Sequence, residues 1–286
     1  MNAAAAITDW VGRTRQDEDE VALAAVRRLA ATLDRDPAAL TRGGELPESW
    51  YAILFAPLAC HSALGTDGHP ATGDFLPPLG GMRRVFGGRR TRFVAPLRIG
   101  EAVERRSTVT AVATRTGRQG ALTLVTVSHA ISSAAGLAIT EEQDIIYRTI
   151  DGAAALRPAD ETAGADGASH WSRTLHVDPA LVFRYSALTF NAHRIHYDLA
   201  YAREVEGYPA LLVNGGLTAL LLIEAARPRL PRPIAFYAAR AVRPLFVGDR
   251  VTLSGRLRAG GAELWAAASD GGVAYRVELT FPGAAP

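Results

Sequence analysis

The sequence predicts an α+β protein made of two related halves, each with a helix laid against an antiparallel sheet. The chain has 286 residues, 48% of them hydrophobic and 21% charged, so it can bury a sizeable core in one large domain or two small ones. Helix-like segments precede a run of strand-like segments, and this order occurs twice. The motif P-L-x-x-G-[DE]-x-V also occurs twice, at Pro96–Val103 and Pro244–Val251. Because the same elements surround both copies, we interpret them as an internal duplication.

The first half begins with two predicted helices and a long loop. Asp17–Leu33 is predicted to be an amphipathic helix, because apolar residues recur there at helical spacing. Trp50–Leu64 is apolar and long enough to be a buried helix, whereas Gly65–Gly88 is rich in Gly and Pro and predicts a loop. Four strand candidates follow: Arg92–Ala95, Ala102–Ala113, Ala121–Ser132 and Ala138–Arg148.

The second half repeats this order after a segment of Ala, Gly and Asp at Asp151–Ser169, which we interpret as a linker. We therefore divide the chain into residues 1–150, a linker at 151–169 and residues 170–286. Asp178 and Pro179 predict a capped helix start, and Gly215–Ala226 predicts a hydrophobic helix. The strand candidates are Trp171–Val177, Ile234–Val242, Arg250–Leu257, Glu263–Ala267 and Val273–Phe281.

Composition and charge argue against several classes of function. The net charge is only +2 and the arginines are dispersed, so we expect no nucleic-acid partner. Cys60 is the one cysteine, which leaves no disulfide framework and no cysteine metal site. The first residues lack the basic and apolar regions of a signal peptide, and the longest apolar stretch is too short to cross a bilayer. We therefore expect a cytoplasmic protein without a membrane partner.

The most polar cluster beside apolar sequence contains Asn191, His193, His196 and Asp198. Imidazole exchanges protons near neutral pH and is the natural general acid or base, and a neighbouring Asn or Asp can fix its tautomer. On a helical turn His193 and His196 would share a face. The alternative is a solvated helix start with two surface histidines, but the preceding residues are expected to be core. Those residues are Phe183, Tyr185, Leu188 and Phe190.

A second candidate site lies where Asn214 leads into Gly215 and Gly216 at the start of a hydrophobic helix. Glycines leave the first N–H groups of a helix unhindered, and these carry the positive end of the helix dipole. Such a place can bind a thioester carbonyl and stabilise an enolate. The alternative is that the glycines only permit close packing.

The sequence gives weaker indications of a functional role for the other histidines, the cysteine and a group of arginines. We expect His61 and His129 to be core or sheet residues and Cys60 to be a buried structural thiol. His69, His170 and His176 have no evident partner in the sequence. A group of arginines could contact the phosphates of a CoA or could belong to a solvated loop: Arg83, Arg84, Arg89 and Arg90.

The segment Phe183–Asp198 closely resembles the signature of the type-2 hydroxyacyl-thioester dehydratases. This group includes the mesaconyl-C4-CoA and itaconyl-CoA hydratase-like proteins and belongs to the MaoC-like hydratase superfamily. Arg92–Glu101 and Thr140–Arg148 resemble the companion domain of these proteins. The resemblance implies a double hot-dog fold, in which each half wraps an antiparallel sheet round a long helix. It also implies that the C-terminal half is catalytic, while the N-terminal half shapes the acyl pocket.

Two departures from the family pattern concern the site itself. Thr189 occupies the position of the Asp in the usual D-x-N-P-x-H motif, and His196 lies two residues further along. We favour His196 over His193 as the acid or base, because His196, Tyr197 and Asp198 match the H-x-D that closes that motif. Relatives usually have His before the glycine, whereas this chain has Asn214.

These observations together predict a hydratase or dehydratase of acyl thioesters, a carbon–oxygen lyase. The carbonyl would bind the N–H of Gly215 or Gly216 beside Asn214, and His196 or His193 would activate water positioned by Asn191. Asp198 and Thr189 are expected to orient the site. We expect no metal and no cofactor beyond the CoA or acyl-carrier-protein thioester, a small branched or dicarboxylic acyl group, and a homodimer. The alternatives are a hot-dog thioesterase and a catalytically silent acyl-thioester-binding subunit.

Overall fold

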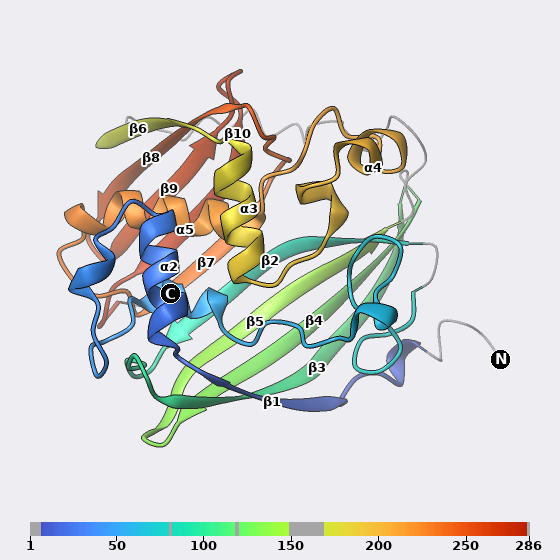
Figure 1. Ribbon diagram of the computed structural model, residues 1–286, viewed down its shortest axis with the longest axis horizontal. Coiled ribbons are helices and arrows are strands. Elements are labelled where there is room, and N and C mark those ends of the chain that lie inside the picture. Colours follow the sequence, from blue (N-terminus) through green and yellow to red (C-terminus); the bar gives the residue numbers. More distant parts are fainter. Residues whose placement is uncertain (1–6, 80–81, 118–119, 149–168, 285–286) are drawn as a thin grey trace.

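One antiparallel sheet of ten strands curves round the helices in the computed structural model of the chain (Figure 1). The structure describes residues 7–79, 82–117, 120–148 and 169–284. The predicted linker therefore lies, apart from its last residue, outside the described residues. No helix in the described part of the chain is both long and apolar enough to cross a membrane.

The elements of the first half, within the residues that the structure describes, are strands, a helix and short 3-10 turns. They are β1 (Thr14–Glu20), α2 (Leu23–Thr32), η1 (Pro37–Ala39), η2 (Glu48–Ile53), η3 (His61–Ala63), β2 (Arg83–Phe93), β3 (Ala102–Gly117), β4 (Gly120–Ser133) and β5 (Gly136–Arg148). The second half contains β6 (Trp171–His176), α3 (Pro179–Leu188), η5 (Arg194–His196), α4 (Leu199–Glu204), α5 (Gly215–Ala226), η6 (Arg227–Arg229), β7 (Phe236–Ala241), β8 (Arg250–Arg258), β9 (Gly261–Ala267) and β10 (Val273–Thr280).

The sheet has the internal symmetry that a duplication produces. Its strand order is β1-β3-β4-β5-β2-β7-β10-β9-β8-β6, so the second five strands repeat the order of the first five from the opposite edge. Strands β2 and β7 pair antiparallel at the centre, from Gly88 opposite Arg240 to Arg92 opposite Phe236. The two halves thus share one continuous sheet.

The repeated motif folds in the same way in both halves. Gly100 and Gly248 have φ values of +96° and +98°, which side-chain-bearing residues rarely adopt. Their N–H groups donate to the carbonyl oxygens of Val21 and Val177, each at 2.8 Å. The shared glycine therefore holds the chain that enters each half against the turn before β3 or β8.

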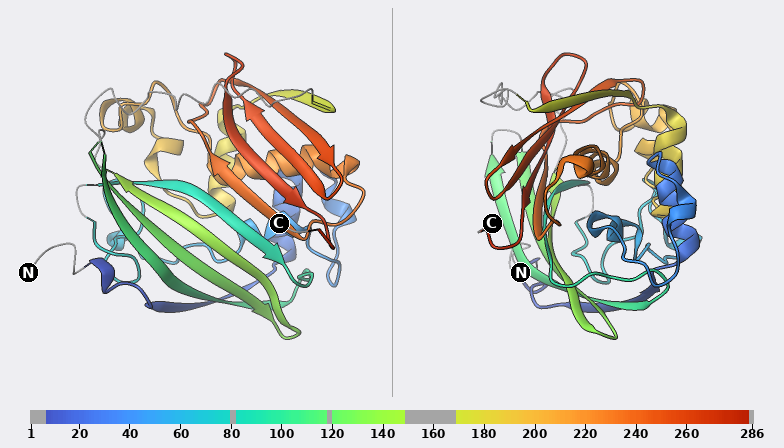
Figure 2. Two further views of the ribbon diagram at one scale, coloured as in Figure 1. Left: turned by 180° about the vertical axis from the view of Figure 1, so that it is seen from behind. Right: turned by 90° about the vertical axis from the view of Figure 1, so that its left-hand side faces the viewer.

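The same symmetry aligns α5 with η2. Leu46 N–H donates to Leu97 O, and Val213 N–H donates to Leu245 O, each at 2.8 Å. Helix α5 begins two residues after Val213 and η2 two residues after Leu46. Figure 2 shows the sheet of the second half curving round α5, whose large apolar side chains are buried against it.

The prediction of a helix at Trp50–Leu64 is wrong. The backbone there forms the short turn η2, then irregular chain, then η3. Pro57 cannot donate a helical hydrogen bond and disfavours helical backbone at the residue before it, and Phe55 has a left-handed φ of +56°. Cys60 and His61 are exposed, not buried as we expected.

Two further boundaries differ from the sequence prediction. Asp17–Glu20 belongs to the edge strand β1, and the helix begins only at Leu23. This charged run suits an edge strand, because a strand with a solvent-facing side tolerates charge. Arg83–Gly88 belongs to β2 and not to a loop, so the arginines of that group lie on the strand of the first half that pairs with β7. The other predicted strands and the helices α3 and α5 are confirmed within a few residues.

A buried polar network lies beside the β2–β7 junction. The Glu141 carboxylate accepts hydrogen bonds from the hydroxyls of Tyr51 and Thr91 and lies 3.5 Å from the Arg89 guanidinium. Tyr51 also shares a 3.0 Å hydrogen bond with Tyr237 on β7. Burial raises the pKa of Glu141, but the charges of Arg89 and His129 and the hydrogen bonds from Tyr51 and Thr91 together outweigh burial, so the net pKa is lowered. The network thus holds an ion pair where the two halves meet.

We predict that Glu141→Gln destabilises the fold strongly. The amide keeps a partner for Tyr51 but leaves the charge of Arg89, whose side chain is 17% exposed, uncompensated, which costs about 3–5 kcal/mol. Urea unfolding of the variant measures this loss. The matched control, Glu45→Gln, breaks the exposed pair with Arg98 and should cost about 1 kcal/mol or less. Equal losses in the two variants would contradict this reading of the network.

Candidate active site

Hydrogen bonds join a loop of the first half, residues 65–70, to the polar cluster of the second half. The backbone carbonyl of Asp67 accepts a 2.9 Å hydrogen bond from Arg194 N–H, and that of Thr66 accepts one of 3.0 Å from the Arg194 guanidinium. Gly68 has a φ of +87°, and a Cβ there would lie 1.9 Å from the carbonyl oxygen of Ala192. Only glycine therefore permits this approach.

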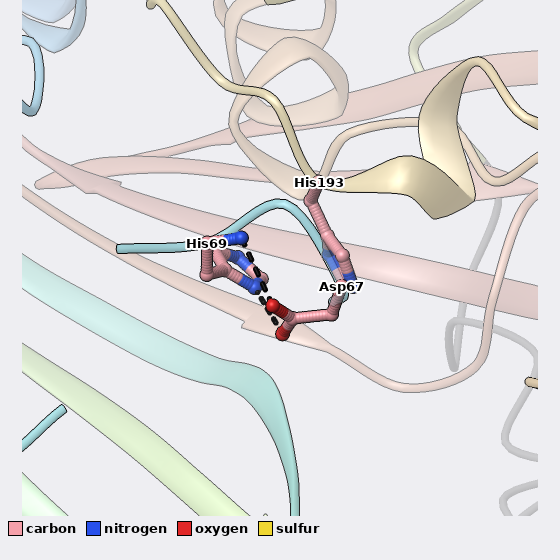
Figure 3. Close-up of side chains that lie close together, drawn as sticks. All are labelled: Asp67, His69 and His193. Atoms are coloured by element: carbon pink, nitrogen blue, oxygen red, sulfur yellow. Dashed lines mark hydrogen bonds and ion pairs between the residues drawn. The ribbon is translucent and has the colours of Figure 1, made fainter. Parts of the chain in front are cut away.

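This contact gathers three imidazoles, two of which are drawn with Asp67 in Figure 3. The ring centroids of His69 and His193 lie 4.0 Å apart, and those of His193 and His196 lie 5.6 Å apart, edge to face. The expected proximity of His193 and His196 is confirmed on the 3-10 turn η5 and the residue before it. The first half contributes the third imidazole.

The two outer imidazoles are each held by one nitrogen. His69 Nδ1 lies 2.8 Å from the carboxylate of Asp67, and His196 Nδ1 lies 2.9 Å from the carbonyl oxygen of Leu212. Both partners accept hydrogen bonds, so each Nδ1 carries the proton and each Nε2 has a free lone pair. A backbone carbonyl, and not a neighbouring Asn or Asp, thus fixes the tautomer of His196.

Burial keeps the imidazoles uncharged near neutral pH. Desolvation, with His69 and His196 nearby, lowers the pKa of His193 to about 2. Desolvation lowers the pKa of His196 to about 4, against the hydrogen bond to Leu212, which raises it. The pKa of His69 is also lowered by burial, but its hydrogen bond to Asp67 opposes the shift. All three rings can therefore accept a proton, and His69 alone has a carboxylate as hydrogen-bond partner.

Within the part of the chain that the structure describes, the N-terminus of α5 has polar groups without hydrogen-bond partners. The Asn214 side chain is 3% exposed; its amide donates a 3.2 Å hydrogen bond to Ser186 Oγ, while its Oδ1 has no partner. The hydroxyl of Tyr275 is also buried without a partner and lies 3.9 Å from where a Cβ of Gly215 would be. No described side chain caps the helix. Buried polar atoms of this kind can bind the polar atoms of a ligand.

The two glycines of this helix start differ in their surroundings. A Cβ at Gly216 would lie 2.3 Å from the Tyr185 hydroxyl, so close packing alone requires glycine there. A Cβ at Gly215 would meet Phe86 and Tyr275 at an ordinary 3.5 Å. Packing therefore explains Gly216, whereas it does not require glycine at Gly215.

Three other predicted site residues hold the local backbone. Asn191 Oδ1 accepts a 3.0 Å hydrogen bond from His193 N–H, and Thr189 Oγ1 donates one of 3.0 Å to Tyr185 O at the end of α3. Asp198 caps α4 and forms a 2.7 Å ion pair with Arg194. The water-positioning role of Asn191 and the orienting roles of Thr189 and Asp198 stay predictions. Phe190 between them has a left-handed φ of +49°, a strain that functional sites often store.

Asp67 and His69 were not among the predicted site residues, because they lie in the other half of the chain from the polar cluster. The available signal was an Asp-x-His pattern within a glycine-rich loop. Among the described residues, Asp67, His69 and His193 also form a group whose metal-ligand atoms lie within 4.8 Å of one another. Because the Asp67–His69 hydrogen bond already accounts for the approach of two of them, we interpret the group as a hydrogen-bonded pair packed on a third ring.

Arg84 on β2 adds positive charge to the same region. Its guanidinium contributes to the lowered pKa of both His69 and His193. No carboxylate in the described part of the chain forms an ion pair with it. By contrast, Arg83 pairs with Glu206 at 2.9 Å and Arg90 pairs with Asp144 at 2.7 Å. Among the described residues, Arg84 is therefore a cation next to the imidazoles that lacks an acidic partner.

Solved structures of low sequence identity share this fold. The chain resembles HtdX of Mycobacterium tuberculosis with a TM-score of 0.67 and 20% identity, covering 93% of this chain and 99% of that one. A MaoC-like dehydratase gives a TM-score of 0.71 at 17% identity over 95% and 98% of the two chains. A further M. tuberculosis protein described as a double hot-dog gives 0.56 at 16% identity over 95% and 96%. The double hot-dog fold is therefore confirmed.

Comparison of sequences gives the family. The chain is 42% identical over 275 residues to the mesaconyl-C(4)-CoA hydratase of Chloroflexus aurantiacus, which covers 96% of this chain and 97% of the relative. It is 39% identical over 74 residues, 25% of each chain, to the mitochondrial hydroxyacyl-thioester dehydratase type 2 of Schizosaccharomyces pombe. The sequence model of hydroxyacyl-thioester dehydratase type 2 matches residues 50–247. The chain therefore belongs to the hydroxyacyl-thioester dehydratase type 2 family.

Proposed function

We propose that this chain is a hydratase/dehydratase that interconverts 2-enoyl and 3-hydroxyacyl thioesters of CoA. The observation that carries this proposal is the hydrogen bond from His196 to Leu212, two residues before Asn214. It ties an uncharged imidazole to the segment that leads into the uncapped N-terminus of α5. The hydrogen bond thus brings a proton acceptor, His196, to the segment that leads into an oxyanion-binding group, the first N–H groups of α5. Addition of water to an enoyl thioester requires both groups.

In the proposed reaction the thioester oxygen accepts hydrogen bonds from the N–H groups of Gly215 and Gly216. The oxygen of water bonds to C3 while His196, or its rival His193, takes a proton from that water. The electrons of the C2=C3 bond move towards the carbonyl and form an enolate, which then takes a proton at C2. Asn191 positions the water, and the free Oδ1 of Asn214 accepts a hydrogen bond from a hydroxyl of the substrate.

The acyl group is proposed to be small and branched or dicarboxylic. Support comes from the relative named mesaconyl-C(4)-CoA hydratase and from Arg84, a cation beside the imidazoles without an acidic partner. A guanidinium in that position suits a substrate carboxylate. The carrier is CoA in this proposal, with an acyl-carrier protein as the alternative.

We further propose that the enzyme needs no metal or redox cofactor, because imidazoles and helix N–H groups can supply acid–base and oxyanion chemistry. We place it in the cytoplasm, where an exposed free thiol such as that of Cys60 stays reduced. Phe183 and Phe190, at and after α3, are exposed and not in the core as we expected, and we propose a homodimer because it would cover them. Light scattering of the purified chain tests the dimer.

Two assays on the purified chain test the proposed function. Hydration removes the absorbance of an enoyl thioester and releases no thiol, whereas a thioesterase releases CoA that a thiol reagent traps. We expect loss of absorbance without thiol release across a panel of short branched and dicarboxylic enoyl-CoA thioesters. Thiol release alone would establish the thioesterase, and CoA-thioester binding without turnover would establish a silent binding subunit.

We predict that His196→Ala lowers kcat/KM by about 10²–10⁴-fold, the range for loss of a general acid or base. The unfolding free energy measured in urea should change much less than activity does. His176→Ala is the matched control, because His176 is exposed at the end of β6. Nearly unaltered activity in the His196 variant would show that this residue is not the acid or base.

We predict that Asn214→Ala lowers kcat/KM for a 3-hydroxyacyl thioester by about 5–150-fold, equivalent to one lost hydrogen bond to a buried polar group. Ser186→Ala is the control, because it removes the bonded partner of Asn214 and leaves the free Oδ1 in place. Steady-state kinetics compare kcat/KM of the two variants. Equal losses in the two would mean that Asn214 serves only to pack the helix start.

A further inference from the structure

We propose that His69, oriented by Asp67, is a second catalytic acid/base group, which the first half supplies for the proton at C2 of the substrate. This inference rests on the proposed hydratase/dehydratase function. It departs from the expectation that the first half only shapes the acyl pocket. The inference is carried by the contacts of the loop 65–70, by the orientation of the His69 ring and by the charges around that ring.

The loop 65–70 is built to hold one imidazole. The carboxylate of Asp67 accepts two hydrogen bonds from His69, one from its backbone N–H at 3.0 Å and one from its ring Nδ1 at 2.8 Å (Figure 3). Gly65 N–H donates to His69 O at 2.8 Å and closes the turn. The ring thus has a fixed tautomer with Nε2 free, which is how catalytic histidines are commonly oriented.

The position of this loop is set by the catalytic segment of the other half. Gly68 approaches Ala192 so closely that a side chain would collide with its carbonyl, and Arg194 donates to the carbonyls of Thr66 and Asp67. The His69 ring therefore packs on His193 at 4.0 Å between centroids. Close contact between two distant segments at backbone level fixes the geometry that proton transfer needs.

The charges around His69 favour a proton on it over a proton on the other two rings. The groups that face it are Asp67 in its own loop, Arg84 on β2, and His193 and His196 from the second half. Only Asp67 is negative, because its hydrogen bonds from His69 outweigh burial and lower its pKa. That charge stabilises an imidazolium at His69, whereas His193 and His196 have pKa values of about 2 and about 4.

A second acid/base group completes the proton balance of the reaction. In hydration, neutral His196 takes one proton from the water whose oxygen bonds to C3, and this proton passes to neutral His69. The His69 imidazolium then gives the proton to C2 of the enolate, so both rings end neutral and no proton is gained or lost. The transfer from His196 to His69 is downhill, because Asp67 stabilises the charge on His69. Dehydration runs the same steps in reverse, with neutral His69 taking the proton from C2.

Hydrogen exchange at C2 tests this assignment directly. A 3-hydroxyacyl-CoA thioester is incubated in D₂O with wild-type enzyme, His69→Gln or His196→Ala, and deuterium at C2 is followed by mass spectrometry. We expect His196→Ala to lose elimination of water but to retain exchange at C2, because His69 is intact. His69→Gln should lose both by at least about 100-fold. His61→Gln, an exposed histidine before the same loop, should behave as wild type.

The pH profile separates a catalytic Asp67–His69 pair from a purely structural one. Asp67 raises the pKa of His69, so Asp67→Asn should lower it and move the acid limb of kcat/KM to lower pH, with a lower plateau. A structural role would reduce activity without moving the limb.

Near-wild-type turnover and C2 exchange in His69→Gln would overturn the inference while leaving the function intact, whereas an inactive wild-type enzyme would refute the function itself. Loss of wild-type activity on chelation, with recovery on adding Zn²⁺, would assign these side chains to a metal ion and overturn the inference.

Discussion

The pairing of β2 with β7 is the constraint on which the rest of the structure depends. Five residue pairs of these strands join two duplicated half-sheets into one, from Gly88–Arg240 to Arg92–Phe236. Gly88 fits this junction because a Cβ there would lie 2.8 Å from the carbonyl oxygen of Ala239. Once the halves share a sheet, the loop that precedes β2 can reach the polar segment after α3. The candidate site is therefore a product of the junction and belongs to both halves.

The two halves differ in the segment that corresponds to the start of α5. The second half has Asn214 and two glycines where the first has Pro47, Glu48 and Ser49. Gly216 lets the helix α5 pack closely against Tyr185. The first half forms a 3-10 turn and irregular chain at the corresponding place. The irregular chain is long enough to carry His69 across to the second half. The first half, which has a short 3-10 turn where the second half has α5, thus has a segment that contributes to the candidate site of the second half.

Local patterns in the sequence predict much of this structure. The features that were not predicted depend on contacts between residues far apart in the sequence. Alternating residues predicted most strands, and the cap at Asp178 predicted the start of α3. The paired motif predicted the duplication, because Gly100 and Gly248 are needed for the same backbone conformation. The apolar composition of Trp50–Leu64 led to the wrong prediction of a helix, because Pro57 and the left-handed backbone of Phe55 do not permit one there. The partnership of His69 with His193 depends on residues 124 positions apart, and no local pattern encodes it.

A crystal structure with a non-reactive saturated acyl-CoA analogue tests the central claim most directly. The account predicts the thioester oxygen within hydrogen-bond distance of the N–H groups of Gly215 and Gly216. It also predicts C2 facing His69 and C3 facing His196. A thioester bound away from the α5 N-terminus, or an acyl chain that meets neither imidazole, would contradict the account.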